Sequence, residues 1–207
     1  MLLSRERRFL FVHVYKNAGT SITKALMPFA ASKGRVLATK GLARLGVRAP
    51  FGPQPFAEHI SAPELIEAMG REAFDAFFSF AIVRNPWDWQ VSLFHYMRKE
   101  RAHHQHVLAK SFAGFDDYIR WRCREEVRFQ RDFIYSRDGE LLVDFVGRFE
   151  NLDSDFASIC ARIGISASLP KLNVSNTKPY RSFYGDETRE LVRRAFAPDV
   201  ALFGYDF

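Results

Sequence analysis

The sequence predicts an α/β fold with a central, mainly parallel sheet flanked by helices. Two short apolar runs, Phe9–Val14 and Phe77–Val83, are typical of buried strands, because a strand covered on both faces is hydrophobic along nearly its whole length. Each run is followed by a segment of helical character, and strands that alternate with helices favour a parallel sheet. The chain has 207 residues, which suits one domain, so we expect a single domain over residues 1–207.

Start and stop signals define the expected helices. Ser61 and Glu64 have the spacing of a capping box, with Pro63 in the first turn, which predicts a helix start. Before this cap, Phe56–Ile60 is a candidate second strand. Residues 31–57 are rich in Gly, Pro, Lys and Arg, and we expect a long functional loop there. Further helices are expected at Ser21–Phe29, Pro86–Glu100, Phe115–Arg124, Asn151–Ile163 and Asp186–Phe196.

Composition indicates a soluble protein. Hydrophobic residues make up 47% and charged residues 26%, which is ordinary for a globular domain. No stretch approaches the ~18 uninterrupted apolar residues of a membrane span, so we expect no membrane insertion and a cytoplasmic location. Cys123 and Cys160 are too few for a disulfide framework, and no Cys and His spacing resembles a zinc site.

Positive charge is concentrated at the start of the chain. Residues 1–57 hold ten of the 30 Lys and Arg residues and one of the 24 Asp and Glu residues, Glu6. A field of one sign favours an anionic ligand, because it raises the local ligand concentration. A solvated basic face is the alternative. Nucleic acid is not expected as a partner, because no nucleic-acid-binding motif accompanies the charge.

The segment Tyr15–Ser21 connects the first buried strand to a helix, which is where proteins bind phosphate. Such a loop directs successive backbone N–H groups into one concavity, and the helix N-terminus adds partial positive charge. Lys16 supplies a cation, Gly19 allows close approach of a ligand, and Thr20 and Ser21 supply hydroxyl donors. The Lys precedes the Gly here, unlike in G-x-x-x-x-G-K-[ST], which disfavours a plain ATPase or GTPase. An ordinary capped strand-to-helix turn is the alternative.

A second motif follows the other buried strand. Arg84 stands at the carboxyl end of that strand, where open α/β sheets bind ligands. Ser92 lies about two turns into the helix that begins at Pro86. An Arg fork and a hydroxyl can together bind one phosphate. The alternative is a salt bridge between Arg84 and Asp88 at the helix N-terminus.

Both motifs resemble those of the carbohydrate-type, sulfotransferase family 2-like sulfotransferases, which use the donor PAPS. The segment FVHVYKNAGTSI is similar to their donor-phosphate loop, F-[VI]-H-[VI]-P-K-[TN]-A-G-T-[ST], and VRNPWDWQVS to their 3′-phosphate motif, V-R-[ND]-P-x-[DE]-R-x-x-S. Two departures are Tyr15 in place of Pro and Trp89 in place of Arg. The resemblance extends over essentially the whole chain through Phe149–Leu152, Leu169–Ser175 and Phe203–Phe207.

The resemblance implies a P-loop nucleotide-kinase-like three-layer fold, PAPS as donor and PAP as product. It implies that the 5′-phosphosulfate is held by Lys16, Asn17, Ala18, Gly19, Thr20 and Ser21. It assigns Arg84 and Ser92 to the 3′-phosphate. In the family a C-terminal loop closes over the adenine and the 3′-phosphate, and Lys178 and Arg181 in the loop Asn173–Tyr184 are the candidates here; a solvated loop is the alternative.

Sulfuryl transfer also needs a base and a group that stabilises the leaving phosphate. Lys16 suits the second role. His59 is the expected base because His titrates near neutral pH, and Glu58 is the runner-up. If both lie on a strand, only one of the pair faces the site. No metal is required by this logic. We interpret His13 as a core residue or as one that lies directly behind the site residues, and His103, His104 and His106 as a solvated loop rather than a metal tract.

The sequence therefore predicts transfer of the sulfuryl group of PAPS, by in-line displacement, to a hydroxyl acceptor, in particular a glycan. One alternative is a small-molecule or nucleotide kinase on the same fold, which would bind ATP with Mg²⁺. Another is a non-catalytic polyanion-binding protein that uses the basic residues 1–57.

Overall fold

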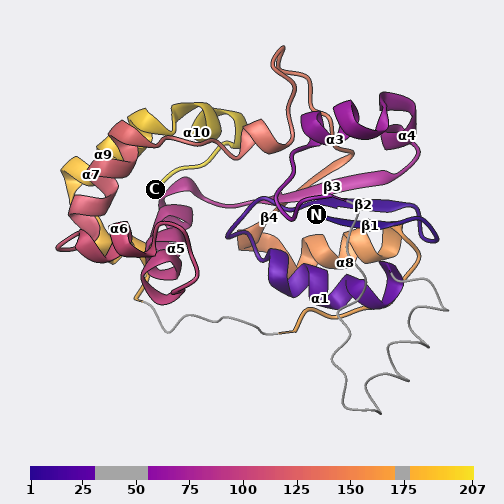
Figure 1. Ribbon diagram of the computed structural model, residues 1–207, viewed down its shortest axis with the longest axis horizontal. Helices are drawn as coiled ribbons and strands as arrows, with labels where there is room; N and C mark the ends of the chain where they lie inside the picture. Colours follow the sequence, from indigo (N-terminus) through magenta and orange to yellow (C-terminus); the bar gives the residue numbers. More distant parts are fainter. Residues whose placement is uncertain (31–55, 171–177) are drawn as a thin grey trace. The chain divides into compact units, whose positions relative to one another are not determined.

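The chain divides into two compact units. The computed structural model describes residues 1–30, 56–170 and 178–207. Unit 1 comprises Met1–Val83 and Phe133–Asn173, and unit 2 comprises Arg84–Asp132 and Val174–Phe207. In the described residues, unit 1 carries the sheet and unit 2 is built from helices (Figure 1). The single domain expected over residues 1–207 stays a prediction.

Unit 1 is organised around a mostly parallel sheet. The described strands follow one another across it in chain order: β1 (Leu2–Ser4), β2 (Phe9–Val12), β3 (Phe78–Val83) and β4 (Phe145–Arg148). The β1 strand runs antiparallel to β2, whereas β2, β3 and β4 are mutually parallel. The mixed α/β class with a mainly parallel sheet is thereby confirmed.

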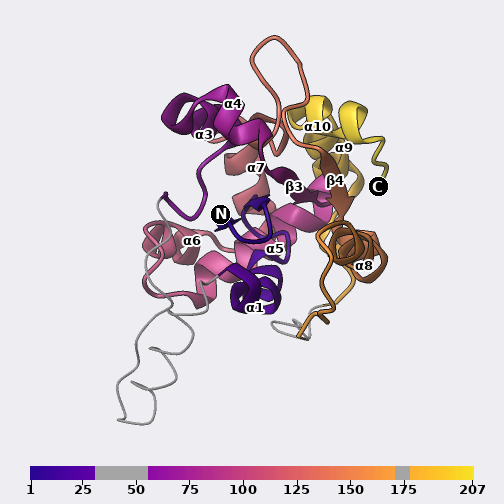
Figure 2. The same ribbon diagram turned by 90° about the vertical axis from the view of Figure 1, so that its right-hand side faces the viewer.

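Helices cover both sides of this sheet. The described helices of unit 1 are α1 (Gly19–Ala30), α3 (Ala62–Met69), α4 (Arg71–Asp75) and α8 (Leu152–Arg162). Figures 1 and 2 show α1 and α8 on one side of the sheet and α3 and α4 on the other. The core on the α1 and α8 side is aromatic, with the Phe11 and Phe80 rings stacked at 5.2 Å. Fully buried Ile22 of α1 and nearly buried Phe156 of α8 belong to the same core.

The predicted strand Phe56–Ile60 is wrong. These residues form a turn in which the Ile60 N–H donates to the Ala57 carbonyl at 3.4 Å. The sequence there does not alternate between apolar and polar residues, so nothing directs one face of a strand into a core. The place beside β2 belongs instead to β1, whose three residues are all buried. This short edge strand was missed because the charged residues after it obscured it.

The residues that mark helix starts and ends predicted the structure better than the apolar pattern at Phe56–Ile60 did. The capping box of α3 is present: Glu64 N–H donates to Ser61 Oγ, and Ser61 N–H donates to the Glu64 carboxylate. The boundaries of the other expected helices lie within two residues of expectation, which is the usual fraying of helix ends, whereas the helices at Arg71–Asp75, His106–Ser111 and Ala197–Phe203 were not expected.

Unit 2 packs its helices around large aromatic side chains. Its described helices are α5 (Pro86–Lys99), α6 (His106–Ser111), α7 (Phe115–Glu125), α9 (Asp186–Ala195) and α10 (Ala197–Phe203). Trp87, Trp89, Tyr118 and Phe196 are fully buried in it. The Tyr118 hydroxyl donates to Gln90 Oε1 at 2.8 Å, which satisfies the one polar atom of that buried ring.

Short 3₁₀ helices complete the described structure, at Arg131–Phe133, Phe149–Asn151 and Tyr180–Phe183. Most of the loop predicted at residues 31–57, and the first half of the loop predicted at 173–184, lie outside the described residues. In the part of the chain that the structure describes, no helix is both long and apolar enough to cross a membrane.

Candidate active site

The loop between β2 and α1 has an unusual backbone. Lys16 and Ala18 both adopt positive φ, 65° and 59°, although neither is glycine. Each such residue costs on the order of 1 kcal/mol, and strain of this kind accumulates where a binding site requires it. Because Asn17 between them has negative φ, the backbone alternates in handedness. Alternation of this kind turns successive N–H groups toward one side and forms an anion-binding nest.

Asn17 anchors this loop to the sheet. Its side chain is almost fully buried, and its Nδ2 donates to the Ile82 carbonyl of β3 at 2.8 Å. This hydrogen bond fixes the loop to the sheet, while half-buried Lys16 and exposed Thr20 remain accessible at the surface of the loop. Ser21 is nearly buried at the start of α1.

Gly19 has a role that the sequence did not reveal. A Cβ at this position would lie 1.6 Å from Nε2 of His13, far inside van der Waals contact. His13 directly follows β2, and its side chain is 6% exposed. The imidazole thus fills the space beneath the loop, and residue 19 must be glycine to accommodate it. Glycine had been expected there for close approach of a ligand.

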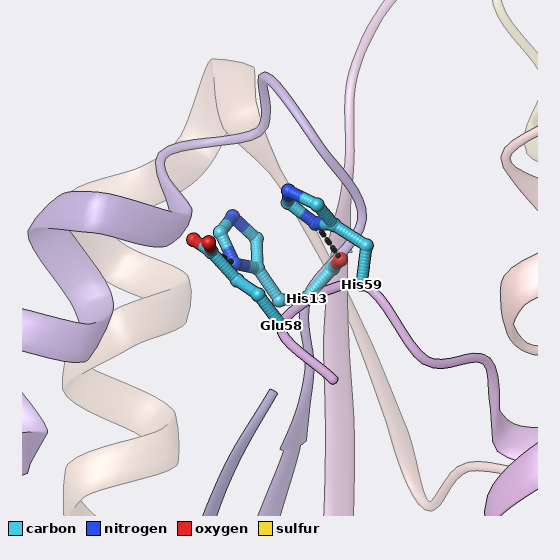
Figure 3. A group of neighbouring side chains, drawn as sticks. All are labelled: His13, Glu58 and His59. Carbon is cyan, nitrogen blue, oxygen red and sulfur yellow. Dashed lines mark hydrogen bonds and ion pairs between the residues drawn. The ribbon is translucent and has the colours of Figure 1, made fainter. Parts of the chain in front are cut away.

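Glu58 and His59 both lie beside His13, as Figure 3 shows. The His13 and His59 ring centroids are 4.5 Å apart, and Oε1 of Glu58 lies 3.4 Å from Nδ1 of His13. The expectation that only one of the pair would face the site assumed a strand, and it does not apply because the segment is a turn. A turn does not send adjacent side chains to opposite faces.

A hydrogen bond sets the tautomer of His59. Its Nδ1 lies 3.0 Å from the His13 carbonyl oxygen, which can only accept a hydrogen bond. Nδ1 therefore carries a proton, and in the neutral ring Nε2 keeps a lone pair. A neutral imidazole with a free Nε2 is the form that can take a proton from a substrate.

His13 itself stays neutral. Burial, followed by the positive electrostatic influence of His59, the N-terminal amine and Lys16, lowers the pKa of His13 to about 3. A neutral ring adds no charge of its own, so the positive charge near His13 comes from its neighbours, which include the N-terminal amine, Lys16 and the helix N-terminus.

The second motif is organised around Arg84, the residue after β3. Its guanidinium Nε and Nη2 donate to Asp88 Oδ2 at 2.8 and 2.7 Å, and both side chains are largely buried. This is the salt bridge that the sequence left open as an alternative. Asn85 caps α5 by accepting from the Trp87 N–H at 3.0 Å, and Pro86 occupies the first turn. The fork is thereby held in a fixed orientation at the N-terminus of α5.

The backbone of Arg84 is held by a residue that sequence reasoning missed. The Arg84 N–H donates to Gln130 Oε1 at 2.9 Å, and Gln130 Nε2 donates to the Arg84 carbonyl at 2.7 Å. The fully buried side-chain amide of Gln130 thus bonds both backbone groups of Arg84, as the backbone of a neighbouring β-strand would. Its own N–H donates to Asp199 Oδ2 at 2.8 Å. No sequence signal marks Gln130, because its partners lie 46 and 69 residues away.

Comparison with known proteins places the two motifs in one family. Residues 1–206 match the family described as "Sulfotransferase family". The chain belongs to the sulfotransferase family. This confirms the resemblance carried by the two motifs. A protein of Archaeoglobus fulgidus, named "Uncharacterized protein", is 27% identical over 117 residues, which cover 55% of this chain and 90% of that protein.

The structure shows the surroundings of Trp89 and Tyr15, the two residues that depart from the sulfotransferase motifs. Trp89 is fully buried in unit 2, with its ring 6.3 Å from that of Phe196 in an edge contact. It is a packing residue, so its position does not present a charge to a ligand. Tyr15 is half-buried and makes edge contacts with the rings of His59 and Phe133, at 6.1 and 5.8 Å. The Tyr15 ring therefore supports one side of the His59 imidazole.

The remaining predicted site residues lie in unit 2. Ser92 is half-buried on α5, and Lys178 is exposed. Arg181 is exposed, and its Nη2 donates to the Phe207 carbonyl at 2.8 Å. Within the described ranges, the tract His103–His106 contributes to no cluster suited to a metal ion, whereas His13, Glu58 and His59 form one.

Proposed function

We propose that this member of the sulfotransferase family transfers the sulfuryl group of PAPS to a hydroxyl group of a carbohydrate. The observation that carries the proposal is the strained nest at Lys16–Gly19, set between a buried strand and a helix N-terminus. Such a loop favours a phosphate over a neutral ligand. The proposal includes one domain over residues 1–207 with a P-loop nucleotide-kinase-like three-layer fold. The cytoplasmic location stays a prediction.

The two phosphate groups of the donor are assigned to separate motifs. We assign the 5′-phosphosulfate to the N–H groups and hydroxyls of the loop, that is to Lys16, Asn17, Ala18, Gly19, Thr20 and Ser21. The 3′-phosphate is assigned to Arg84 and Ser92, with Lys178 and Arg181 as further cations. The salt bridge of Arg84 with Asp88 supports this role, because it orients the fork before a phosphate arrives.

In the proposed reaction the acceptor oxygen attacks sulfur in line with the bond that breaks. The new bond joins the acceptor oxygen to sulfur, and the bond from sulfur to the 5′-phosphate oxygen breaks, which leaves PAP. The acceptor proton passes to Nε2 of His59, whose lone pair is set by the hydrogen bond to the His13 carbonyl. The Lys16 ammonium stabilises the charge that grows on the leaving phosphate. Glu58, at the same cluster, is the alternative base.

A transfer screen tests the function directly. The protein is incubated with PAPS labelled in the sulfuryl group and a panel of glycans, lipids and peptides. We expect labelled product from a glycan with a free hydroxyl, and release of PAP in equal amount. A protein that binds PAP but labels no glycan, while labelling a lipid or peptide, would contradict the carbohydrate assignment. Phosphoryl transfer from ATP with Mg²⁺ would favour a kinase instead.

A further inference from the structure

The cluster of His13, Glu58 and His59 has the composition of a metal site. Each side chain offers one ligand atom, and these atoms all lie within 4.8 Å of one another (Figure 3). His13 and His59 are 46 residues apart in the chain, so the fold rather than a local motif brings them together. Among the described residues, no other group of His, Cys, Asp and Glu side chains meets this condition.

His59 is already oriented as a metal ligand. Histidines that bind metal ions usually donate the other ring N–H to a carbonyl or carboxylate, which fixes the ring and its tautomer. Here Nδ1 of His59 makes this bond to the His13 carbonyl at 3.0 Å and leaves the lone pair of Nε2 available. The outer hydrogen bond that a metal site needs is therefore present in the protein alone.

His13 supplies a second, independent observation. Its side chain is 6% exposed, and its Nδ1 makes no hydrogen bond in the described structure although the atom is buried. A buried polar atom without a hydrogen bond is costly, so it calls for a partner. Oε1 of Glu58 lies 3.4 Å from this atom. Two ligand atoms of a tetrahedral zinc ion stand about 3.4 Å apart when each bond is ~2.1 Å long.

We propose that His13, Glu58 and His59 bind a zinc ion. Two imidazoles and one carboxylate are a ligand set that Zn²⁺ accepts, with water completing the tetrahedron. The side chain of Glu58 is 71% exposed, so it can adjust to the ion and the site is open to it. The nearby Lys16 ammonium repels a cation. We therefore expect micromolar rather than nanomolar affinity.

Zinc at this cluster would regulate the proposed reaction. Nε2 of His59 cannot accept a proton from an acceptor hydroxyl while it ligates a metal ion, so zinc inhibits transfer. This consequence rests on the proposed function, whereas zinc binding does not. Arg84 and Ser92, to which we assign the 3′-phosphate, are not among the proposed zinc ligands. Affinity for PAP, measured on metal-free protein, therefore tests the proposed function separately from zinc binding.

The test is a zinc titration of the protein after treatment with a chelator and removal of that chelator. Competition with a chromophoric zinc indicator gives affinity and stoichiometry, and the visible spectrum of Co²⁺ in place of Zn²⁺ reports tetrahedral coordination. We expect one ion per chain. Glu58→Gln and His59→Gln should each weaken binding at least about tenfold. Both residues are exposed in a turn, so these variants should keep the wild-type circular dichroism.

His104→Ala is the matched control, because His104 is an exposed histidine of the other tract. This variant should bind zinc as the wild type does. The proposal is overturned if the wild type binds no zinc, or if Glu58→Gln and His59→Gln bind it as tightly as the wild type. Loss of binding in His104→Ala alone would assign the ion to the tract and would equally overturn it. Loss of PAP binding by metal-free wild type would instead contradict the proposed function.

Discussion

Gly19 and His13 are matched to each other in the loop that follows β2. The imidazole occupies the volume into which any larger residue at position 19 would project. The His13 ring packs directly against the backbone of Gly19, which has no side chain in the way. This packing supports the positive φ values of Lys16 and Ala18 in the same loop. The loop is thus shaped before any anion arrives, which lowers the cost of binding one.

Gly19→Ala should therefore damage both stability and donor binding. The new methyl group overlaps His13 Nε2, so the loop or the ring must move. We expect a loss of about 1 to 3 kcal/mol in the free energy of unfolding, measured by chemical denaturation. Affinity for PAP should fall at least tenfold in a calorimetric titration. Gly114→Ala is the control, since a Cβ at Gly114 meets nothing within 4 Å. Equal behaviour of the two variants would contradict the interlocked pair.

His59→Ala should separate catalysis from donor binding. The variant removes the proposed base, but it touches none of the groups assigned to the nucleotide. We expect PAP affinity within about twofold of wild type and a fall in the transfer rate of about 10² to 10⁴, the usual contribution of a general base. Unchanged transfer would eliminate His59 as the base, and Glu58→Gln would then be the variant to measure.

At the scale of elements, the backbone of Arg84, two residues before α5, is held by a buried side-chain amide. Gln130 pairs with both backbone groups of Arg84, and Asp199 of α10 fixes Gln130 in turn. Arg84 is thereby positioned by residues that come from two later parts of the chain. Gln130 acts as a positioning residue, and it is not expected to contact the nucleotide.

Gln130→Met should weaken recognition of the 3′-phosphate specifically. The Met side chain is of similar size but leaves both backbone groups of Arg84 without their partner, at a cost of about 1 to 3 kcal/mol. We expect affinity for PAP to fall about tenfold, while affinity for 5′-AMP, which lacks the 3′-phosphate, stays unchanged. Parallel calorimetric titrations measure the ratio. An equal loss for both nucleotides would indicate a general structural defect instead.

Asp199 should make the stability of the protein depend on pH. Burial raises the pKa of Asp199 to about 6 from 3.8, so folding favours its protonated form. Its contribution is present in full below pH 3.8 and is lost as pH rises through 6. The stability of wild type relative to Asp199→Asn should then decrease by about 2 kcal/mol between pH 4.5 and 7.5. Chemical denaturation at both values measures it, and a relative stability that rises with pH would contradict the account.

At the scale of the whole molecule, the sequence predicts those elements that are marked by a continuous apolar run or by residues a few positions apart. Phe9–Val14 and Phe77–Val83 were recognisable as strands because both of their faces are buried, and the α3 cap was recognisable because its groups lie three residues apart. The segment at Phe56–Ile60 was mistaken for a strand, since a short apolar stretch carries no clear period. Contacts across the fold, such as those of Gln130, leave no trace in a single sequence.

The candidate site was predictable to a similar degree. The order and spacing of the two motifs pointed to the sulfotransferase family, and the family match over residues 1–206 bears this out. The contact of His59 with His13 could not be anticipated, because it depends on a turn that brings residue 59 back to the end of β2. The same contact explains why His13, for which a core position and a position directly behind the site were both expected, is buried and lies against His59.

The central claim is that the protein recognises a nucleotide with phosphates at both the 3′ and 5′ positions. The most direct measurement is a pair of calorimetric titrations of the wild type, one with PAP and one with 5′-AMP. The account predicts that PAP binds at least tenfold more tightly, since a charge-assisted Arg fork on a phosphate contributes about 1.5 to 3 kcal/mol. No binding of PAP by the folded protein, or equal affinity for the two nucleotides, would contradict it.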